Sequence, residues 1–291
     1  AAGLIVLGMW VCEVFSSLTL VALVGRWRRK EGLSGPGESG AVCRRKLAAV
    51  ALPIGATALL GNLLGAANAA LIPQKLVEGG LDRSEALAEF GVVCGMTMPM
   101  LAVPTVFLGA VSLVVTPRLA RAAALERGEE IRALTGRTVR AVSLLALPAM
   151  ALMAAAGGDL GVLLFRQERA GEFILPLAGV MALCCWESAL NSILSGVGRQ
   201  RQVAAVSILS GGVQAAVTFG TAAKLGMAGY VLGAAVSALL GLGLSLYLTA
   251  KYTGARPDWM EWFWMPGLAA LLAGLNARLL LRVIQDMGMP A

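Results

Sequence analysis

The chain consists of long apolar runs separated by short polar connections. Each run has about 20 residues, which is the length that an α-helix needs to cross the hydrocarbon core of a bilayer. The pattern therefore predicts an all-α polytopic membrane protein with about eight transmembrane helices. The predicted spans cover residues 3–25, 47–72, 91–115, 141–157, 173–197, 203–223, 226–250 and 263–283.

Two prolines lie well inside the third apolar run. Pro99 and Pro104 occur in the sequence MTMPMLAVPT. A proline inside a helix removes a backbone hydrogen bond, so we expect a kinked or broken helix here, with its freed carbonyls turned to a neighbour or a cavity. Pro99 and Pro104 are hinge candidates. A tolerated kink without a role in gating is an equally open interpretation.

Other prolines are expected near the ends of spans, where a missing N–H costs least. We expect Pro53, Pro148 and Pro176 near the starts of their helices, and Pro73 at the end of the second span. In the connection that follows, Asp82 precedes Glu85 by three residues, which is typical of a capping box. This spacing predicts that a helix begins at Arg83 and continues into the third span.

Composition supports a membrane protein and places its connections. The chain has 58% hydrophobic and 14% charged residues, with a mean hydropathy of +0.77. The net charge of +7 comes from basic residues in short connections rather than on one broad face, so the positive-inside rule explains it better than nucleic-acid binding. The rule predicts that loops 26–46 and 118–140 are cytoplasmic and that loop 73–90 is extracellular. Aromatic residues at predicted span ends agree with this placement; they are Trp27, Tyr252, Trp259, Trp262 and Trp264.

The residue types argue against several kinds of chemistry. The chain has no histidine, which excludes a histidine metal site or proton relay. Its cysteines have no metal-ligand spacing, and we expect them to be small buried hydrophobes; they are Cys12, Cys43, Cys94, Cys184 and Cys185. No Walker motif and no nucleophile–base pairing is present, so we expect no enzyme activity, no cofactor and no metal.

Polar residues inside the spans are the candidates for function, because hydrocarbon does not solvate them. Glu187, Asn191 and Ser195 recur every four residues in the fifth span and therefore share one helix face, with Cys184 beside them. Glu13 and Glu187 have no basic residue three or four positions away, which favours a water-filled pathway and makes them possible coupling carboxylates. For the asparagines, ordinary hydrogen bonding between helices is the alternative.

Small residues recur at the spacing that allows close helix packing. Gly61 and Gly65 form a GxxxG pattern, and the seventh span carries a small residue at every fourth position from 229 to 241. Such faces let helix backbones approach closely in lipid. Packing alone explains them, although glycine-rich faces also suit helices that slide.

Several stretches carry a family resemblance. The run LPIGATALLGNLLGAANAALIPQKLVEGGLDRSEALAEFGVVCGMTMPMLAVPTVFLGAVSLVVTPRLARA resembles the corresponding part of stage V sporulation protein B and its polysaccharide-biosynthesis relatives, in the multidrug/oligosaccharidyl-lipid/polysaccharide flippase superfamily. LLALPAM, LLFRQERAG and NSILSGVGRQRQ agree with it. The resemblance extends over residues 46–250.

The resemblance implies a domain organisation. Family members have two six-helix lobes followed by extra helices. On that template, residues 1–25 are the last helix of an N-terminal lobe whose other helices are missing here, and residues 26–46 are a basic cytoplasmic linker. Residues 47–250 are the C-terminal lobe, and 251–291 form an additional, truncated helix. We therefore expect a C-terminal portion of a longer protein.

The resemblance also implies a function: a flippase of a bacterial plasma membrane that moves a lipid-linked saccharide of the undecaprenyl type, as in cell-wall or spore-cortex formation during sporulation, by alternating access. We expect the chain to contribute one wall of the cavity, and the residues selected by polarity and position are Asn62, Asn68, Thr97, Glu187 and Asn191. A cation-coupled multidrug antiporter of the same superfamily is one alternative. The other is a membrane scaffold without transport activity that binds envelope-biosynthesis proteins.

Overall fold

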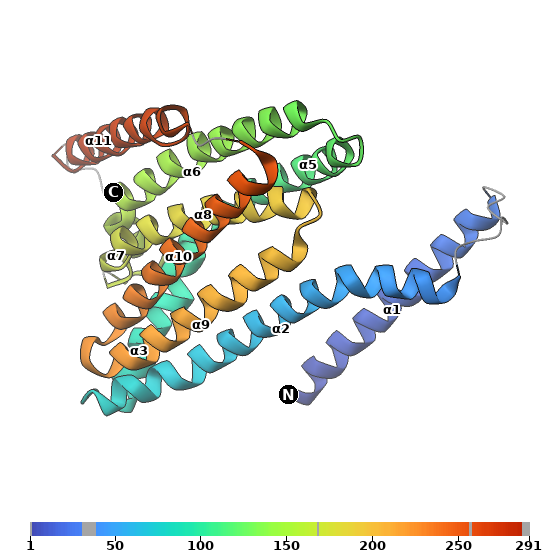
Figure 1. Ribbon diagram of the computed structural model, residues 1–291. Helices are drawn as coiled ribbons and strands as arrows, with labels where there is room; N and C mark the ends of the chain where they lie inside the picture. Colours follow the sequence, from blue (N-terminus) through green and yellow to red (C-terminus); the bar gives the residue numbers. More distant parts are fainter. Residues whose placement is uncertain (1, 31–38, 168, 256–257, 287–291) are drawn as a thin grey trace. The chain divides into compact units, whose positions relative to one another are not determined.

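The computed structural model describes residues 2–30, 39–167, 169–255 and 258–286 of the chain. All regular structure in these residues is helical, as Figure 1 shows, which confirms the predicted all-α fold. The α-helices are α1 (Ala2–Lys30), α2 (Gly40–Glu78), α3 (Arg83–Gly91), α4 (Met98–Ala102), α5 (Thr105–Ala124), α6 (Gly128–Phe165), α7 (Arg169–Glu172), α8 (Ile174–Gly196), α9 (Gln200–Leu225), α10 (Met227–Thr253) and α11 (Met265–Asp286). Two short π-helices, η1 (Val92–Thr97) and η2 (Met260–Trp264), lie directly before α4 and α11.

Nine helical segments of the described chain are long and apolar enough to cross a membrane. The sequence pattern predicts about eight. The difference arises at the third predicted span, where two candidate segments, 83–102 and 105–124, replace one. The chain turns between them at Val103 and Pro104, where Val103 N–H bonds the Met100 carbonyl in a tight turn. The predicted break in this helix is therefore present.

Both segments run alongside the same neighbouring helix, α8. Near the start of α8, the Thr97 hydroxyl lies 2.9 Å from the Ala170 carbonyl oxygen. Near its end, Leu119 of α5 packs against Gly196. The chain from Thr97 to Leu119 thus follows α8 from one end to the other. Because one helix of that length crosses a bilayer once, the two pieces together make one crossing.

Several helices extend beyond the predicted spans. Pro73 does not end the second span, because α2 continues to Glu78. Pro148 lies inside α6 rather than near a helix start, because α6 already begins at Gly128 within the arginine-rich connection. Helices also enter the basic connection 26–46 from both sides, through the end of α1 and the start of α2. A run of apolar residues predicts the part of a helix that lies in the membrane. It does not predict how far the helix extends into the polar connections.

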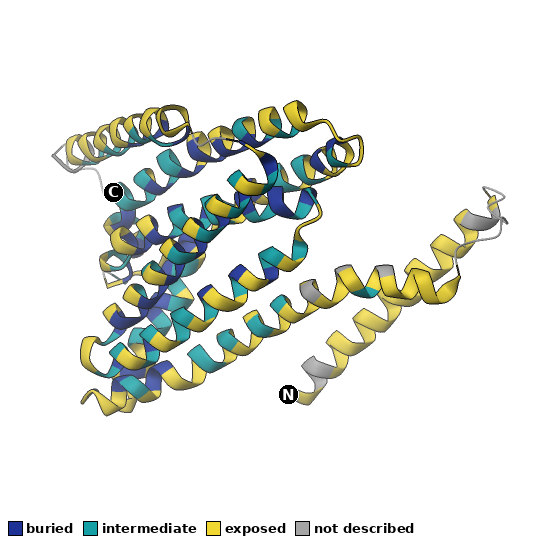
Figure 2. Ribbon diagram, in the orientation of Figure 1, coloured by how far each residue is buried: buried dark blue, intermediate teal, exposed yellow. Residues whose placement is uncertain are grey.

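The chain divides into two compact units, residues 1–49 and 50–291. In the first unit, the described side chains of α1 are exposed (Figure 2), including those of Cys12 and Glu13. Cys43 is exposed as well, so the expectation of buried cysteines is wrong for Cys12 and Cys43. In the second unit Cys185 is buried, whereas Cys94 and Cys184 are partly exposed.

The core of the second unit is built around α8, which packs against α5, α6 and α10 (Figure 1). Its fully buried side chains include Ile174, Leu177, Leu190 and Ile193. They extend along the whole helix because α8 has neighbours along its entire length. Figure 2 shows the buried positions gathered on the faces by which these helices meet.

The ends of the helices in the second unit gather in the groups that the alternating topology predicts. At one end, Gly79 after α2 lies against the Ala223 carbonyl of α9. At the other end, Arg132 of α6 packs over Gly254 after α10, and Arg199 lies over the ring of Tyr252 at 4.1 Å. The connections predicted to be cytoplasmic in this unit thus share one end of the bundle.

Candidate functional site

The candidate site is a polar face on α8. Glu187, Asn191 and Ser195 lie at intervals of four residues, and Ser188 and Ser192 form a second row beside them. Helical periodicity places both rows on one side of the helix. On the opposite side of this part of α8 lie the buried core residues Leu190 and Ile193, so core packing fixes the direction in which the polar face points.

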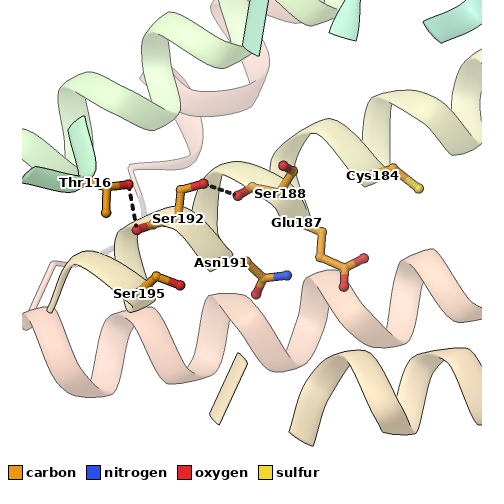
Figure 3. A pocket seen from close by; sticks show the side chains of 7 residues that line it. All are labelled: Thr116, Cys184, Glu187, Ser188, Asn191, Ser192 and Ser195. Carbon is orange, nitrogen blue, oxygen red and sulfur yellow. Dashed lines mark hydrogen bonds between the residues drawn. The ribbon is translucent and has the colours of Figure 1, made fainter. Parts of the chain in front are cut away.

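This face borders a pocket of about 370 Å³, which we call the α8 pocket. Figure 3 shows its lining side chains, which come almost entirely from α8 and include one residue of α5, Thr116. The lining residues are Thr116, Cys184, Glu187, Ser188, Asn191, Ser192 and Ser195. Every one of them is polar or carries sulfur, which is unusual for a surface within an apolar helix bundle. Such a surface retains water or binds a polar ligand.

A second pocket, of about 330 Å³, lies among α8, α9 and α10, and we call it the α9–α10 pocket. Its polar lining includes Ser207, Ser210, Gln214 and Ser237. Glu187 and Cys184 line both pockets. The Glu187 carboxyl group therefore stands between a polar pocket towards α5 and a mainly apolar pocket towards α9 that has a few polar side chains.

The space for the Glu187 side chain is created by a glycine on the facing helix. A Cβ atom at Gly241 of α10 would overlap the Glu187 carboxylate. Asn191 lies one turn along α8, and Figure 3 shows both side chains on the same side of the helix. No described basic residue forms an ion pair with Glu187. The carboxylate thus has polar neighbours but no fixed counter-ion.

Hydrogen bonds hold the rest of the face in place. Asn191 Oδ1 accepts a hydrogen bond of 2.9 Å from the Ser245 hydroxyl of α10. On the other side, Ser192 Oγ lies 2.9 Å from both Ser112 Oγ of α5 and the Ser188 carbonyl oxygen. Because a hydroxyl has a single proton, Ser192 can donate to the carbonyl and accept from Ser112. These contacts tie α8 to α5 and α10 by side chains that also line the pocket.

The structure brings together only part of the predicted site. Glu187 and Asn191 lie side by side, whereas Asn62 is exposed on α2 and Asn68 is half-buried on the same helix. Thr97 is buried and bonded to backbone carbonyls, which is a packing role. None of these three lines either pocket. Glu13 belongs to α1, in the other unit of the chain.

The hinge candidates lie in the broken segment beside α8. Pro99 is exposed in α4, and Pro104 is buried at the turn before α5. Immediately before Pro99, the backbone of η1 is a π-helix, a distortion that frequently marks functional sites. Met98, which follows η1, lines the α9–α10 pocket. The distortion thus adjoins the site.

Four lining or supporting residues are absent from the predicted set: Ser112, Thr116, Ser188 and Ser192. Their signal is present in the sequence, since Ser112 and Thr116 are four residues apart and so are Ser188 and Ser192. Serine and threonine satisfy their hydroxyls locally in helices, so such spacing is weak without knowledge of the neighbouring helix. Two pairs of this kind on adjacent helices are the pattern to search for.

The arrangement can bind a polar ligand or a cation. It presents hydroxyl and amide groups, which donate and accept hydrogen bonds, together with one carboxylate that attracts cations. Within the described residues, no three cysteine, aspartate or glutamate side chains converge in a way that would hold a metal ion. Comparison with known proteins gives no match: no family model, no curated protein sequence and no solved structure is similar to this chain.

Proposed function

We propose that this chain is a membrane flippase, or the C-terminal part of one, that translocates a lipid-linked saccharide by alternating access. The observation that carries the proposal is the polar face of α8, with Glu187 between two pockets inside a bundle of membrane-spanning helices. Polar groups on a membrane-spanning helix are costly unless they serve a pathway or a partner. Sites of this kind in transporters lie near the middle of the membrane at discontinuous helices, and the broken α4–α5 segment runs along α8.

The substrate class rests on the resemblance of residues 46–250 to polysaccharide-biosynthesis flippases. A saccharide pyrophosphate carries many hydroxyl groups, and the serines and Asn191 of the α8 pocket offer matching hydrogen bonds. Within this proposal, the membrane is a bacterial plasma membrane, and the arginine-rich end of the second unit faces the cytoplasm. An undecaprenyl chain would remain in the lipid while its headgroup crosses.

A cation-coupled multidrug antiporter is the second candidate, and Glu187 is the observation that favours it. A carboxylate in the membrane without a described ion-pair partner can exchange a proton or sodium ion during a transport cycle. The two candidates differ in what moves. The flippase moves a lipid headgroup, whereas the antiporter moves a soluble drug in exchange for a cation.

The test is transport in vesicles that contain the full-length protein. We expect translocation of a fluorescent lipid-linked saccharide and none of a lipid that lacks the sugar pyrophosphate. Glu187→Gln should reduce the rate by about tenfold or more, since it removes a charge-assisted interaction. The control Glu172→Gln changes an exposed carboxylate of α7 and should leave the rate unchanged. Flux of protons or sodium that depends on a drug, without lipid movement, would replace the flippase by the antiporter; no flux of either kind would contradict both.

A further inference from the structure

A third pocket lies between the start of α6 and the segment that leads from α10 to α11. It has a volume of about 540 Å³ and we call it the α6–η2 pocket. Its lining residues are Arg132, Gly136, Gly254, Ala255, Asp258, Glu261 and Trp262. It shares no residue with the two pockets around Glu187, so it requires an explanation of its own.

The pocket is lined by both signs of charge. Arg132 lies on one wall, bonded to Glu129 at 2.9 Å, and its guanidinium packs over Gly254. Asp258 and Glu261 lie on the other wall. One oxygen of Asp258 accepts the N–H groups of Met260 and Glu261, and one oxygen of Glu261 pairs with Arg140 at 3.3 Å. The second oxygen of each carboxylate has no partner among the described residues.

A buried donor adds a more specific observation. Trp262 is only 5% exposed, and its indole N–H donates no hydrogen bond to any described residue. The side chain as a whole is buried, but it lines the pocket, where its N–H is available to donate to a ligand or water. The indole nitrogen is 4.0 Å from the place where Gly136 would carry a Cβ atom. Gly136 and the indole nitrogen therefore line the same part of the pocket.

The surroundings point to the membrane interface. Trp259 and Trp264, on either side of the pocket's Trp262, are 58% and 67% exposed. Exposed tryptophans at the end of a membrane helix favour the headgroup region of the bilayer. Met260 and Met265 are exposed next to them, which provides an apolar surface for acyl chains. A ligand reaching this pocket from the bilayer would enter headgroup first.

From these contacts we propose that the α6–η2 pocket binds a phosphoethanolamine group, the headgroup of a zwitterionic phospholipid. Its phosphate fits Arg132 and the Trp262 N–H, because both are donors. Its primary ammonium fits the free oxygens of Asp258 and Glu261. A purely anionic headgroup would face these two carboxylates, and a choline headgroup would lack the N–H donors that they accept. This site is independent of the transport proposal.

The experiment is native mass spectrometry of the full-length protein in detergent with added phosphatidylethanolamine, phosphatidylcholine or phosphatidylglycerol. We expect phosphatidylethanolamine to bind about tenfold more tightly than either other lipid, as befits one or two charge-assisted hydrogen bonds. Trp262→Phe keeps an aromatic ring and removes the N–H donor. Asp258→Asn keeps a side-chain oxygen that accepts the backbone N–H groups of Met260 and Glu261, and it removes the negative charge. Trp262→Phe should weaken binding of all three lipids, because each carries the phosphate, whereas Asp258→Asn should lose the preference for phosphatidylethanolamine. Gly136→Ala, which adds a methyl group to the pocket lining 4.0 Å from the indole nitrogen, should weaken binding of all three lipids, whereas Gly158→Ala, whose Cβ meets nothing within 4 Å on the same helix α6, should not.

Two further outcomes are decisive. If soluble phosphoethanolamine displaces the lipid with comparable affinity, the chemistry of the site stands and its natural ligand is the free compound. Equal binding of all three lipids by the wild-type protein would overturn the proposal, as would a preference for phosphatidylethanolamine that Asp258→Asn retains or an affinity that Trp262→Phe leaves unchanged. The thermal midpoint of each variant, measured without lipid, identifies any that fails to fold.

Discussion

At the scale of single residues, several polar side chains in the membrane part of the second unit bond one another across helices. Asn191 meets Ser245, Ser192 meets Ser112, and the Trp186 indole donates to Ser143 Oγ at 2.8 Å. Glu187 differs from these pairs, because it is bounded by a glycine and two pockets rather than by a complementary charge. The paired residues join helices, whereas the Glu187 carboxylate faces pocket space.

The Asn191–Ser245 hydrogen bond should contribute modestly to stability. Interhelical hydrogen bonds in membranes contribute about 0.6 kcal/mol on average, because the unfolded chain in lipid also finds partners. We expect a double-mutant cycle with Asn191→Ala and Ser245→Ala to give a coupling free energy of about that size. Unfolding in a denaturing detergent measures it. Strictly additive effects would show that the pair does not interact.

The Asp82 cap gives a pH dependence outside the membrane. The Ser84 hydroxyl and backbone N–H both donate to the Asp82 carboxylate, and these bonds lower the pKa of Asp82 below its usual value. A lowered pKa means that the cap stabilises α3 fully above the unfolded-state pKa and loses this effect as the pH falls through the folded-state pKa. The structure thus confirms Asp82 as the N-cap residue of the predicted capping box, and Ser84 is the residue that donates to it.

Hydrogen exchange across residues 83–90 measures this cap. We expect protection, corrected for the intrinsic exchange rate, to decrease as the pH is lowered below the usual range of an aspartate. Asp82→Asn retains a side-chain acceptor without a titrating group, so its protection should not follow pH in this way. Identical pH profiles for the two proteins would rule out the carboxylate as the source.

At the scale of elements, close packing of α9 and α10 depends on the small residues at every fourth position of α10. A Cβ atom at Gly229 would lie 2.8 Å from the Ala222 backbone nitrogen, and one at Gly233 would lie 3.0 Å from the Gln214 carbonyl oxygen. Backbone atoms cannot move aside as a side chain can. The sequence pattern therefore marks a genuine contact face.

Gly229→Ala should consequently destabilise the protein by about 1 to 3 kcal/mol, the usual cost of adding a methyl group to a tightly packed contact. Gly243→Ala, on the same helix, is the matched control, because its Cβ would meet nothing within 4 Å. It should be neutral or slightly stabilising, since alanine favours helix more than glycine does. Thermal unfolding of the two variants side by side measures the difference, and equal midpoints would contradict the packing account.

The elements also show what the sequence can and cannot predict. Apolar runs of spanning length predict the helices, and Pro99 with Pro104 predicts the break between α4 and α5. The pattern does not reveal that Pro73 and Pro148 lie inside helices, because neighbouring helices can compensate for a missing backbone hydrogen bond. Nor does the pattern reveal that the Trp262 side chain is buried within the protein rather than exposed at the end of a span. These outcomes depend on tertiary contacts.

The candidate site, too, can be predicted from the sequence only in part. The spacing of Glu187 and Asn191 on one helix is visible in the sequence, and the structure retains it. Asn62 and Thr97 satisfy the same polarity criterion, but they differ in what surrounds them: one is exposed and the other bonds a backbone carbonyl. Sequence alone gives the polarity of a residue. The partner that satisfies it comes from another part of the chain.

At the scale of the whole molecule, the connections of the second unit gather at two ends as strict alternation requires. The charge rule adds which end is inside. In a cysteine-free background, Ser84→Cys and Lys224→Cys should react with an impermeant maleimide added outside intact cells, whereas Ser39→Cys should react only after permeabilisation. The reverse pattern would invert the orientation, and labelling of Ser84→Cys and Lys224→Cys from opposite sides would contradict the alternation itself.

The central claim is that the polar face of α8 lines a water-filled substrate pathway, and cysteine accessibility along that face tests it most directly. In the cysteine-free full-length protein, we predict that Ser188→Cys and Ser195→Cys react with a charged thiol reagent and that a lipid-linked saccharide protects them. Leu113→Cys is the control: it adjoins Ser112, which bonds Ser192, so it lies at a similar depth, and it is 79% exposed on an apolar surface. It should not react. Unreactive Ser188→Cys and Ser195→Cys in a protein that folds and transports would contradict the claim.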